Sequence, residues 1–517
     1  MSKKLILLIL DGLGHSSQLL GNAVKEAYMP TLRMIERNYP SCLLQASGLA
    51  VGLPFGEAGN SEVGHLNIGA GRIVEQYLPR INRSIADGSF SKIDALHGAF
   101  IHAKSRGGIV HLAGLLTSGT VHASFTHLVG ILDFALEYKD VPLFLHCFTD
   151  GKDGGLQEGV ELIEKLELEL QKRGLGKIVT IVGRKIAMDR DNNWPSTEKT
   201  YKLMTQAKGE IIDSAKDYLQ SCYDKDLNDQ IIEPAVLRQN NFTGIKDGDS
   251  LIFWNFREDA IRQIARAFFE PGFNKFAISV FNDLYGATMT LYQDNLNAKA
   301  LFPLPNINNS LAEVLSLSGL KQYHITETEK YAHVTYFFDG LKESPFENEE
   351  WEFVETDRDF INLPEMRSAE ISEKIVSKIK DKDTNFIVAN FPNGDILAHT
   401  GNLEATIKGL EAIDRVLLNI YDVAVATRST LFITSDHGNA ESLIYTGSGE
   451  RETRHDDSPV PFFLVANEHK NKTGNDWKLP NEADGVLADV APTILEIFDI
   501  QKPAEMSGES LLRLLFR

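Results

Sequence analysis

Short apolar runs alternate along the chain with longer segments in which apolar residues recur at helical spacing. Runs of about four to eight apolar residues followed by a helix-like segment are typical of buried strands in a parallel sheet. Three such runs end close to an acidic residue: residues 5–10 before Asp11, 386–388 before Asp395, and 430–434 before Asp436. This pattern predicts the α/β fold class, with a mostly parallel sheet.

The acidic residues that follow these three runs are expected to lie close together. In open α/β sheets, ligands bind beyond the carboxyl ends of the strands, and residues placed there converge even when hundreds of residues separate them in the chain. Asp11, Asp395 and Asp436 therefore form the first candidate site.

A second series of strand and helix patterns lies between roughly residues 80 and 300. Strands are predicted at residues 108–112, 141–146, 178–182 and 251–254, and a long helix at residues 157–173. Residues 301–307 have the proline and asparagine content of a linker, and a matching crossing is predicted near residues 78–80. We therefore predict a discontinuous domain of residues 1–78 and 308–517, an inserted domain of residues 79–300, and a linker at residues 301–307.

The length and composition of the chain narrow the choice of compartment and partner. At 517 residues the chain exceeds the usual size of one hydrophobic core, and no stretch approaches the ~20 apolar residues of a membrane span. Asp11 interrupts the first apolar run and no small-residue cleavage site follows, so we interpret this run as a strand and not as a signal peptide. Three widely spaced cysteines, Cys42, Cys147 and Cys222, fit a reducing cytoplasm. Because the net charge of −20 disfavours nucleic acid, we expect a cytoplasmic monomer that binds no nucleic acid and no membrane.

Several residues carry the ligand atoms that divalent transition metals prefer. Carboxylate oxygens and imidazole nitrogens suit Mn²⁺ or Zn²⁺, and two such ions can stabilise both the attacking and the leaving oxygen of a phosphoryl transfer. The candidates are Asp11, Ser61, Asp395, His399, Asp436, His437 and His455. Asp395 and His399 lie four positions apart, so both can face one ion if a helix follows the strand. Asp436 and His437 either bridge two ions from a strand end, or only one of them is a ligand.

Ser61 is the candidate nucleophile. It lies in the segment GNSEVGH, residues 59–65, which we interpret as a glycine-flanked turn. Glycine lets a ligand approach the backbone closely, and an exposed serine can act as a nucleophile if a metal ion lowers its pKa. The alternative is a capping serine in a surface loop.

Basic residues of the middle segment provide a candidate anion site in this otherwise acidic protein. They are Lys152, Arg184, Arg190, Arg257 and Arg262, with Lys330 just past the linker. The planar donor fork of arginine binds carboxylate or phosphate, so several converging arginines would hold a small phosphorylated acid. His122 and Asp153 can then transfer protons. Taken singly, most of these residues only solvate a surface.

Sequence segments spread over nearly the whole chain connect these weak signals. They are DGLG at residues 11–14, LP at 53–54, GNSEVGHLNIGAGR at 59–72, GR at 183–184, AMDRD at 187–191, ETEKYAHVT at 327–335 and SDHGN at 435–439. Together they resemble the cofactor-independent phosphoglycerate mutases of the alkaline phosphatase superfamily. The resemblance implies an alkaline-phosphatase-like domain interrupted by an inserted α/β transferase domain.

The same resemblance implies a role for each candidate residue. One metal ion is held by Asp395, His399 and His455, and the other by Asp11, Ser61, Asp436 and His437, with Mn²⁺ favoured. The implied substrate-binding residues are His122, Lys152, Asp153, Arg184, Arg190, Arg257 and Lys330. Ser61 attacks the phosphoryl group of 3-phosphoglycerate, the glycerate turns over while bound, and the phosphoserine returns the group to the 2-hydroxyl without a bisphosphoglycerate primer. The expected function is therefore a phosphoglycerate mutase of glycolysis and gluconeogenesis.

The middle domain departs from the family pattern near the substrate. Lys152 and Ala260 each replace an arginine, Ser124 replaces a histidine, and Gly154-Gly155 replaces a Thr-Pro pair. If Arg257 and position 260 lie one helical turn apart, loss of one charged hydrogen bond weakens binding by roughly 10- to 150-fold and lets water intercept the phosphoserine. Two alternatives stay open: a diverged phosphatase or phosphotransferase acting on another small phosphorylated acid, and a catalytically silent paralogue. In a mutase we expect the two domains to open and close at the linkers, since both must act on one small molecule.

Overall fold

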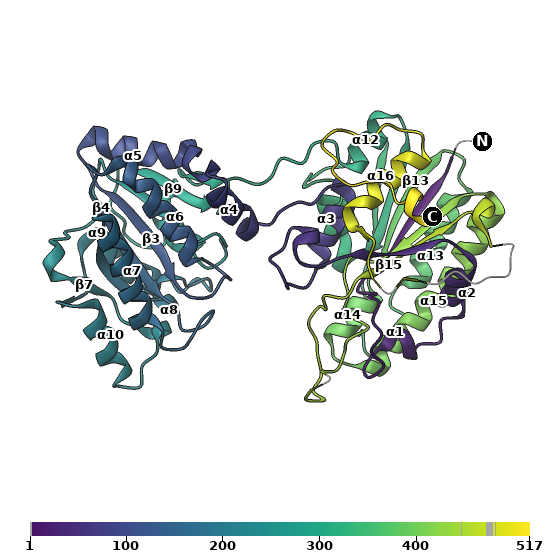
Figure 1. The fold of residues 1–517 in the computed structure, drawn as a ribbon, viewed down its shortest axis with the longest axis horizontal. Helices are drawn as coiled ribbons and strands as arrows, with labels where there is room; N and C mark the ends of the chain where they lie inside the picture. Colours follow the sequence, from purple (N-terminus) through teal and green to yellow (C-terminus); the bar gives the residue numbers. More distant parts are fainter. Residues whose placement is uncertain (1–2, 446, 472–478, 481, 517) are drawn as a thin grey trace. The chain divides into compact units, whose positions relative to one another are not determined.

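The computed structural model describes residues 3–445, 447–471, 479–480 and 482–516. The chain forms two compact units. Unit 1 comprises Met1–Gln76 and Pro305–Arg517, and unit 2 comprises Tyr77–Leu304 (Figure 1). The chain therefore leaves unit 1 once, builds unit 2 from one continuous segment, and returns. Each unit contains one large sheet with helices on it, so the predicted α/β class is confirmed.

The sheet of unit 1 has eight strands in the order β12-β11-β13-β1-β14-β15-β2-β16. The strands are β1 (Leu5–Leu10), β2 (Ser41–Gln45), β11 (Lys321–Glu327), β12 (Glu349–Val354), β13 (Thr384–Phe391), β14 (Thr430–Thr434), β15 (Val460–Val465) and β16 (Gly485–Val486). From β12 to β14 all neighbours are parallel, and β15 is antiparallel to both β14 and β2. The carboxyl ends of five parallel strands therefore share one edge of the sheet.

Helices cover both faces of this sheet (Figure 1). They are α1 (Ala23–Glu26), α2 (Pro30–Asn38), α3 (Ser61–Ala70), α12 (Leu311–Leu317), α13 (Ser368–Lys380), α14 (Asn393–His399), α15 (Leu403–Thr427), α16 (Val490–Ile497) and α17 (Leu512–Leu515), with the helical turns η6 (Thr328–Lys330) and η7 (His333–Phe337). Successive residues of β1 point to opposite faces. Ile6 and Leu8 pack with α2, α13 and α15, whereas Leu5 and Leu7 pack with α3, α12 and α16. Burial on both faces explains why the strand is apolar without alternation.

The sheet of unit 2 also has eight strands, in the order β10-β9-β8-β3-β4-β5-β7-β6. They are β3 (Val110–Leu116), β4 (Leu143–Thr149), β5 (Lys177–Gly183), β6 (Glu210–Ile212), β7 (Ala235–Leu237), β8 (Ser250–Phe253), β9 (Tyr285–Thr290) and β10 (Lys299–Phe302). Its helices are α4 (Tyr77–Ala86), α5 (Asp94–Arg106), α6 (Phe125–Ala135), α7 (Gly159–Arg173), α8 (Arg184–Ala187), α9 (Trp194–Gln206), α10 (Ala215–Tyr223) and α11 (Arg262–Phe269). All neighbouring strands are parallel except β5 and β7.

The predicted elements are present, with shifted ends in unit 2. β1 and β14 span the predicted residues, and β13, β3, β4, β5, β8 and α7 overlap their predictions. The predicted linker at 301–307 overlaps β10, because Leu301 and Phe302 extend a strand and are buried. The crossing predicted at residues 78–80 lies inside α4, where Pro79 occupies the first turn, a helical position that tolerates the missing N–H.

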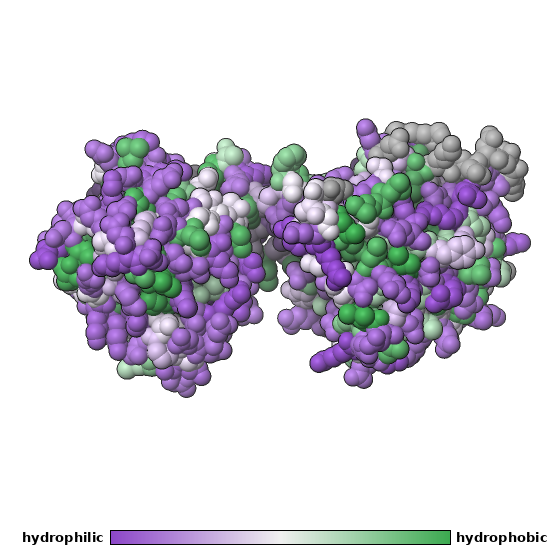
Figure 2. Space-filling view, turned by 90° about the horizontal axis from the view of Figure 1, so that it is seen from below, coloured by the Kyte–Doolittle hydropathy of each residue, from purple (hydrophilic) through white to green (hydrophobic). Residues whose placement is uncertain are grey.

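The described surface is mostly hydrophilic. Figure 2 shows apolar residues in small separate groups among hydrophilic ones in both units, as is usual for protein surfaces. Within the described ranges, no helix is both long enough and apolar enough to cross a membrane.

Candidate active site

Charged side chains gather at the carboxyl ends of four parallel strands of unit 1. Asp11 follows β1, Asp395 lies in α14 after β13, and Asp436 and His437 follow β14. Lys330 comes from η6, which follows β11. Since parallel strands end at one edge of the sheet, the topology itself brings these residues together, as the sequence predicts for the three aspartates.

Asp395, His399 and His455 form a group with the chemistry of a metal site. The Nε2 atoms of His399 and His455 each lie 3.2 Å from Asp395 Oδ1, and they are 3.0 Å from each other. Each histidine uses Nδ1 for a backbone carbonyl, Thr453 O at 2.7 Å and Gly59 O at 2.8 Å. In the neutral rings Nδ1 then carries the hydrogen, and both Nε2 lone pairs face the Asp395 carboxylate. Metal-binding histidines have this arrangement, and the helix expected between Asp395 and His399 is α14.

The electrostatics of this group favour a positive charge. The hydrogen bond to Asp395 raises the pKa of His399, and the charge of that carboxylate adds to the effect against the cost of burial. Burial raises the pKa of Asp395, but Lys330 and the neighbouring histidines outweigh it and hold the pKa well below its ordinary value. The groups around Asp395 therefore stabilise its ionised carboxylate, to which a cation can bind.

Ser61 lies at the centre of a second group. Its Oγ is 2.5 Å from Lys330 Nζ, 2.9 Å from His437 Nε2 and 3.2 Å from Asp11 Oδ1. Lys330 Nζ also contacts Asp11 Oδ1 at 3.0 Å and Asp395 Oδ2 at 2.7 Å. The structure thus places Lys330 beside the predicted nucleophile and two predicted metal ligands.

Both nitrogen groups in contact with Ser61 are cationic. Burial disfavours the charge on His437, but Asp436 and the hydrogen bond to Asp11 raise its pKa to about 10. Burial also opposes the charge on Lys330, whereas Asp11, Asp395 and Asp436 together raise its pKa. A negative charge that develops on Ser61 Oγ would therefore be stabilised.

Two residues that the sequence analysis did not single out complete this group. His65 Nδ1 lies 3.1 Å from Asp436 Oδ2, and Asn390 Nδ2 donates to Asp11 Oδ2 at 2.7 Å. The ligand atoms of Asp11, His65 and Asp436 lie within 4.8 Å of one another, as do those of Asp11, Asp395 and His437. His65 lies in the same sequence segment as Ser61, so the sequence offers it as a candidate ligand. Asn390 lies in an apolar strand, where nothing in the sequence indicates a site residue.

Asp436 carries an independent indication of a cation. It is fully buried, and its Oδ2 lies 3.1 Å from His65 Nδ1 and 3.7 Å from His437 Nε2. Burial raises the pKa of Asp436, but the charges of His437 and His65 outweigh it and hold the pKa far below its ordinary value. An ionised, buried carboxylate is costly unless positively charged groups or a metal ion lie against it. The donor set of unit 1 therefore fits divalent metal ions.

Ser61 is the first residue of α3 and is buried, so the predicted exposed turn is wrong. Asn60 caps the helix by accepting from Val63 N at 3.0 Å. Gly64 and Gly59 allow close packing: a Cβ at Gly64 would lie 2.5 Å from Asp436 O, and one at Gly59 would lie 2.1 Å from Ala46 O. The consequence is a serine at a helix N-terminus, where the partial positive charge favours phosphate.

Unit 2 carries a second charged cluster at the carboxyl ends of its parallel strands. His122 follows β3, Asp153 follows β4 and Arg184 follows β5. His122 Nδ1 lies 2.6 Å from Asp153 Oδ2, and Arg184 Nη1 lies 2.9 Å from Asp153 Oδ1. Asp150, which was not predicted, contacts Arg184 at 2.5 Å. The side chain of Lys152 is exposed beside this group.

Asp259 connects the remaining predicted residues of unit 2 and was also missed. Its carboxylate lies 2.8 Å from Arg190 Nη1, 3.2 Å from Arg257 Nη2 and 3.2 Å from His122 Nε2. Arg190 and Arg257 are about half exposed, so an anion from solvent can compete with Asp259 for them. The contacts of Asp259 with Arg190 and His122 join separate parts of the chain, so no local sequence pattern predicts them.

The helical relation assumed for Arg257 and Ala260 is wrong. Both lie before α11, which begins at Arg262, and Ala260 is buried in the turn next to Asp259. Arg262 contacts Glu258 at 3.1 Å and donates to Tyr292 O at 2.9 Å, which gives it a structural role. The Asp259 carboxylate, which contacts the Arg257 guanidinium and accepts from Ala260 N, thus decides how this turn is arranged, and not helical spacing.

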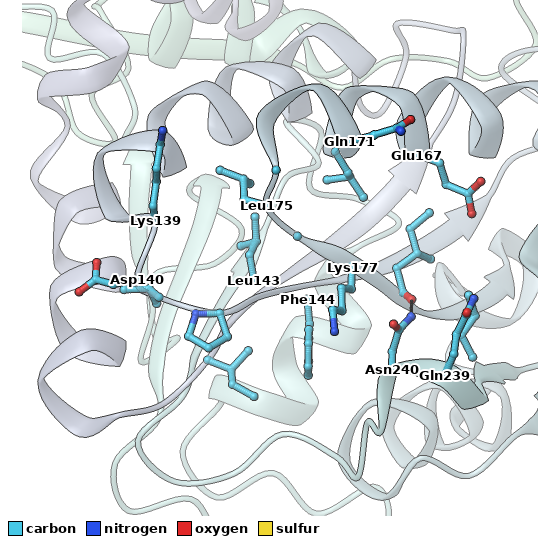
Figure 3. A pocket seen from close by; sticks show the side chains of 18 residues that line it. Lys139, Asp140, Leu143, Phe144, Glu167, Gln171, Leu175, Lys177, Gln239 and Asn240 are labelled. Atoms are coloured by element: carbon cyan, nitrogen blue, oxygen red, sulfur yellow. Dashed lines mark hydrogen bonds between the residues drawn. The ribbon is translucent and has the colours of Figure 1, made fainter.

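A large hollow of unit 2 is separate from this cluster. It has a volume of about 820 Å³ and is lined by Leu143, Lys177 and other residues at the amino ends of β3, β4 and β5 (Figure 3). The charged cluster lies at the opposite, carboxyl ends of the same strands. Because ligands of open α/β sheets bind at the carboxyl ends, the hollow is not the active-site candidate.

The fold and the metal-ligand groups define a class of proteins. The model of the Metalloenzyme superfamily matches residues 3–502. Among curated relatives, the 2,3-bisphosphoglycerate-independent phosphoglycerate mutase of a Synechococcus strain is 42% identical over 98% of this chain and 95% of its own length. That of Clostridium beijerinckii is 41% identical over 99% of both chains. The chain belongs to this family of phosphoglycerate mutases within the Metalloenzyme superfamily.

A solved structure agrees with the sequence comparisons. The crystal structure of Leishmania mexicana phosphoglycerate mutase at low cobalt concentration has a TM-score of 0.61 and 29% sequence identity, and the match covers 98% of this chain and 97% of that one. The similarity therefore extends over both units.

Proposed function

We propose that this chain interconverts 3-phosphoglycerate and 2-phosphoglycerate through a phosphoserine on Ser61, without bisphosphoglycerate. The observation that carries the proposal is the environment of Ser61 Oγ, which contacts Lys330, His437 and Asp11 at 2.5–3.2 Å at the N-terminus of a helix. The family membership supports the choice of substrate.

The residues of unit 1 account for the transfer steps. The Ser61 Oγ–phosphorus bond forms while the bond from phosphorus to the 3-oxygen of glycerate breaks. Asp11 Oδ1 is within reach of the Ser61 proton, and the Lys330 ammonium stabilises the charge on Oγ. The 3-oxygen gains a proton and the 2-hydroxyl later loses one, so the full cycle consumes neither water nor protons.

We also propose that two divalent metal ions, most suitably Mn²⁺, act in this reaction. Asp395, His399 and His455 would hold one ion, and Asp11, Ser61, Asp436 and His437 the other, with His65 as a further candidate ligand. Bound ions supply positive charge that stabilises the transferring phosphoryl group. The buried carboxylates of Asp11, Asp395 and Asp436, and the facing Nε2 atoms of His399 and His455, support this assignment.

In unit 2, His122, Lys152, Asp153, Arg184, Arg190 and Arg257 would bind the phosphorylated acid. Arg190 and Arg257 are the most available cations of this group because each is about half exposed. Cys42, Cys147 and Cys222 are buried free thiols, which supports a cytoplasmic location. Since one chain supplies every proposed site residue, we propose that the monomer is the active form.

An enolase-coupled assay tests the proposed function directly. The protein is supplied with 3-phosphoglycerate and Mn²⁺, without bisphosphoglycerate, and 2-phosphoglycerate formation is followed. Turnover supports the mutase. No 2-phosphoglycerate, combined with turnover of another phosphorylated acid from a substrate panel, would support the diverged phosphatase or phosphotransferase instead.

We predict that chelation removes the activity and that Mn²⁺ restores it. The seven proposed ligands form two groups, in which carboxylate oxygens and imidazole nitrogens lie close enough together to bind metal ions. The activity should fall to background after dialysis against a chelator and recover when Mn²⁺ is added, with elemental analysis at each stage. Full activity in a preparation shown to be metal-free would contradict the prediction.

Ala260→Arg distinguishes between the two candidate substrates. Position 260 adjoins Asp259, which contacts Arg190 and Arg257, so a guanidinium that extends out of the buried position of Ala260 enlarges the same basic group, and the melting temperature checks that the turn tolerates it. If the substrate is phosphoglycerate, kcat/KM should rise by roughly 10-fold or more, and release of free glycerate and phosphate should fall. Gln171→Arg is the matched control, because it adds the same charge at the hollow on the opposite end of the sheet. Unchanged phosphoglycerate turnover, together with good wild-type activity on another phosphorylated acid, would favour the alternative.

A further inference from the structure

A third group of metal-ligating side chains lies in unit 1, inside the protein and apart from the Ser61 site. His324 is in the middle of β11, Glu349 is the first residue of β12, and Asp339 follows η7. Their ligand atoms lie within 4.8 Å of one another, and the three side chains are 0% exposed. None of them takes part in the proposed phosphoryl transfer.

Strand register places two of these residues on the same face of the sheet. β11 and β12 are parallel neighbours in which Gln322 pairs with Glu349 and His324 pairs with Trp351. Residues two apart in a strand point to the same side, so His324 and Glu349 both face the side on which Phe338 and Phe386 pack. The group therefore has apolar surroundings that exclude water.

The tautomer of His324 follows from its hydrogen bond. His324 Nδ1 lies 2.7 Å from Val334 O, and a carbonyl oxygen only accepts, so Nδ1 carries the hydrogen. Burial lowers the pKa of His324 and favours the neutral ring, against the opposing charge of Glu349. Its Nε2 then presents a lone pair to Glu349 Oε1, 3.2 Å away. Two acceptors face each other at hydrogen-bond distance, with no hydrogen between them.

The two carboxylates are equally short of positive charge. Glu349 Oε2 accepts from Phe346 N at 2.7 Å, but Glu349 Oε1 and both oxygens of Asp339 have no hydrogen-bond partner among the described residues. No lysine or arginine in the described ranges pairs with either carboxylate. Burial, the charge of Glu349 and a hydrogen bond between the two carboxyl groups when Asp339 is protonated raise the pKa of Asp339 well above its ordinary value, against the opposing effect of the Trp351 indole.

We propose that His324, Asp339 and Glu349 form a third divalent-cation site with a structural role. One imidazole nitrogen and two carboxylates suit a transition-metal ion such as Zn²⁺ or Mn²⁺ better than an ion that prefers oxygen ligands only. A cation here would satisfy four buried atoms that otherwise have no partner: His324 Nε2, Glu349 Oε1 and both Asp339 oxygens.

The position of the site suggests what the ion stabilises. The segment between His324 and Asp339 contains Lys330, which contacts Ser61, and His333, whose ring packs on His65 at 5.6 Å. An ion bound by His324, Asp339 and Glu349 clamps both ends of this segment to the sheet. It thereby acts as a positioning element for Lys330 and not as a participant in the reaction.

Metal counting tests the site without relying on activity. The full-length protein is stripped with a chelator, reloaded with Zn²⁺ or with Mn²⁺, desalted and measured by elemental analysis. Asp339→Asn should bind one ion per chain fewer than the wild type. Glu352→Gln is the matched control, since Glu352 lies on the same strand but is paired with Lys374 at 2.6 Å and Tyr323 at 2.5 Å, and its metal content should be unchanged.

A second comparison separates this site from the proposed catalytic ions. In an Asp395→Ala, Asp436→Ala background, which removes a ligand from each of the two proposed catalytic ions, the added ion should still raise the melting temperature, and this rise should disappear when Asp339→Asn is added. If Asp339→Asn does not fold, Glu349→Gln provides the same comparison. Equal metal content in the wild type and in these variants would overturn the proposal and indicate that Asp339 and Glu349 share a proton instead, in which case Asp339→Asn should raise the melting temperature.

Discussion

Ser61→Ala should abolish the interconversion of phosphoglycerates while the protein stays folded. The substitution removes the oxygen that contacts Lys330, His437 and Asp11, and with it the proposed acceptor of the phosphoryl group. We expect turnover to fall on the order of 10⁴-fold or more, as for other enzymes that lose their nucleophile. Alanine is well suited to the first turn of α3, so the melting temperature should change little. The measurement is the enolase-coupled assay after reconstitution with Mn²⁺, with circular dichroism as the check on folding.

Two further observations make this test specific. Ser84→Ala is the control, because Ser84 is also buried and hydrogen-bonded, to Ser89 at 2.9 Å, but belongs to unit 2. Its activity should stay close to that of the wild type. Mass spectrometry of the wild type mixed with substrate should find a phosphoryl group on Ser61. Substantial mutase turnover by Ser61→Ala would rule out the phosphoserine route.

Lys330→Met should destabilise the metal-free protein strongly and the metal-loaded protein much less. Lys330 Nζ lies 3.0 Å from Asp11 Oδ1 and 2.7 Å from Asp395 Oδ2, and its side chain is only 7% exposed. Removing the ammonium leaves buried carboxylates without that counter-charge, which costs about 3–5 kcal/mol in comparable buried pairs. Divalent ions on the same carboxylates would supply the missing charge, so Mn²⁺ should narrow the difference. Activity should fall on the order of 10²- to 10³-fold, because one donor to the reacting oxygen is lost.

Urea unfolding with chelator and with Mn²⁺ measures both parts of this prediction. The control is Lys374→Met, which removes an ammonium that is 33% exposed and paired with Glu352. A partly exposed pair of this kind contributes at most about 1 kcal/mol, so this variant should be nearly as stable as the wild type in both conditions. An equal loss of stability for Lys330→Met with and without Mn²⁺ would show that the ions do not bind the carboxylates around Lys330.

Elements in which the chemical pattern is local agree best with the sequence analysis. The apolar runs before Asp11 and Asp436 form β1 and β14. A short and continuous apolar run is typical of a strand that is buried on both faces of a sheet. The spacing of Asp395 and His399 was also sufficient, since residues four apart in a helix lie on one face. The glycines around Ser61 predict a turn, and this prediction is wrong, because in the structure they permit tight packing of a helix.

The sequence by itself determined the α/β class, the family, and the convergence of the acidic residues, because parallel strands end at one edge whatever their separation in the chain. Only the tertiary structure decided which side chains touch. Lys330 and Asp11 are 319 positions apart, and their contact depends on β11 and β1 lying on either side of β13 in one sheet, which no local pattern records. Asn390, Asp259 and the buried group of His324, Asp339 and Glu349 became visible for the same reason. The role of a buried polar side chain depends on which groups contact it, and those groups come from distant segments of the chain.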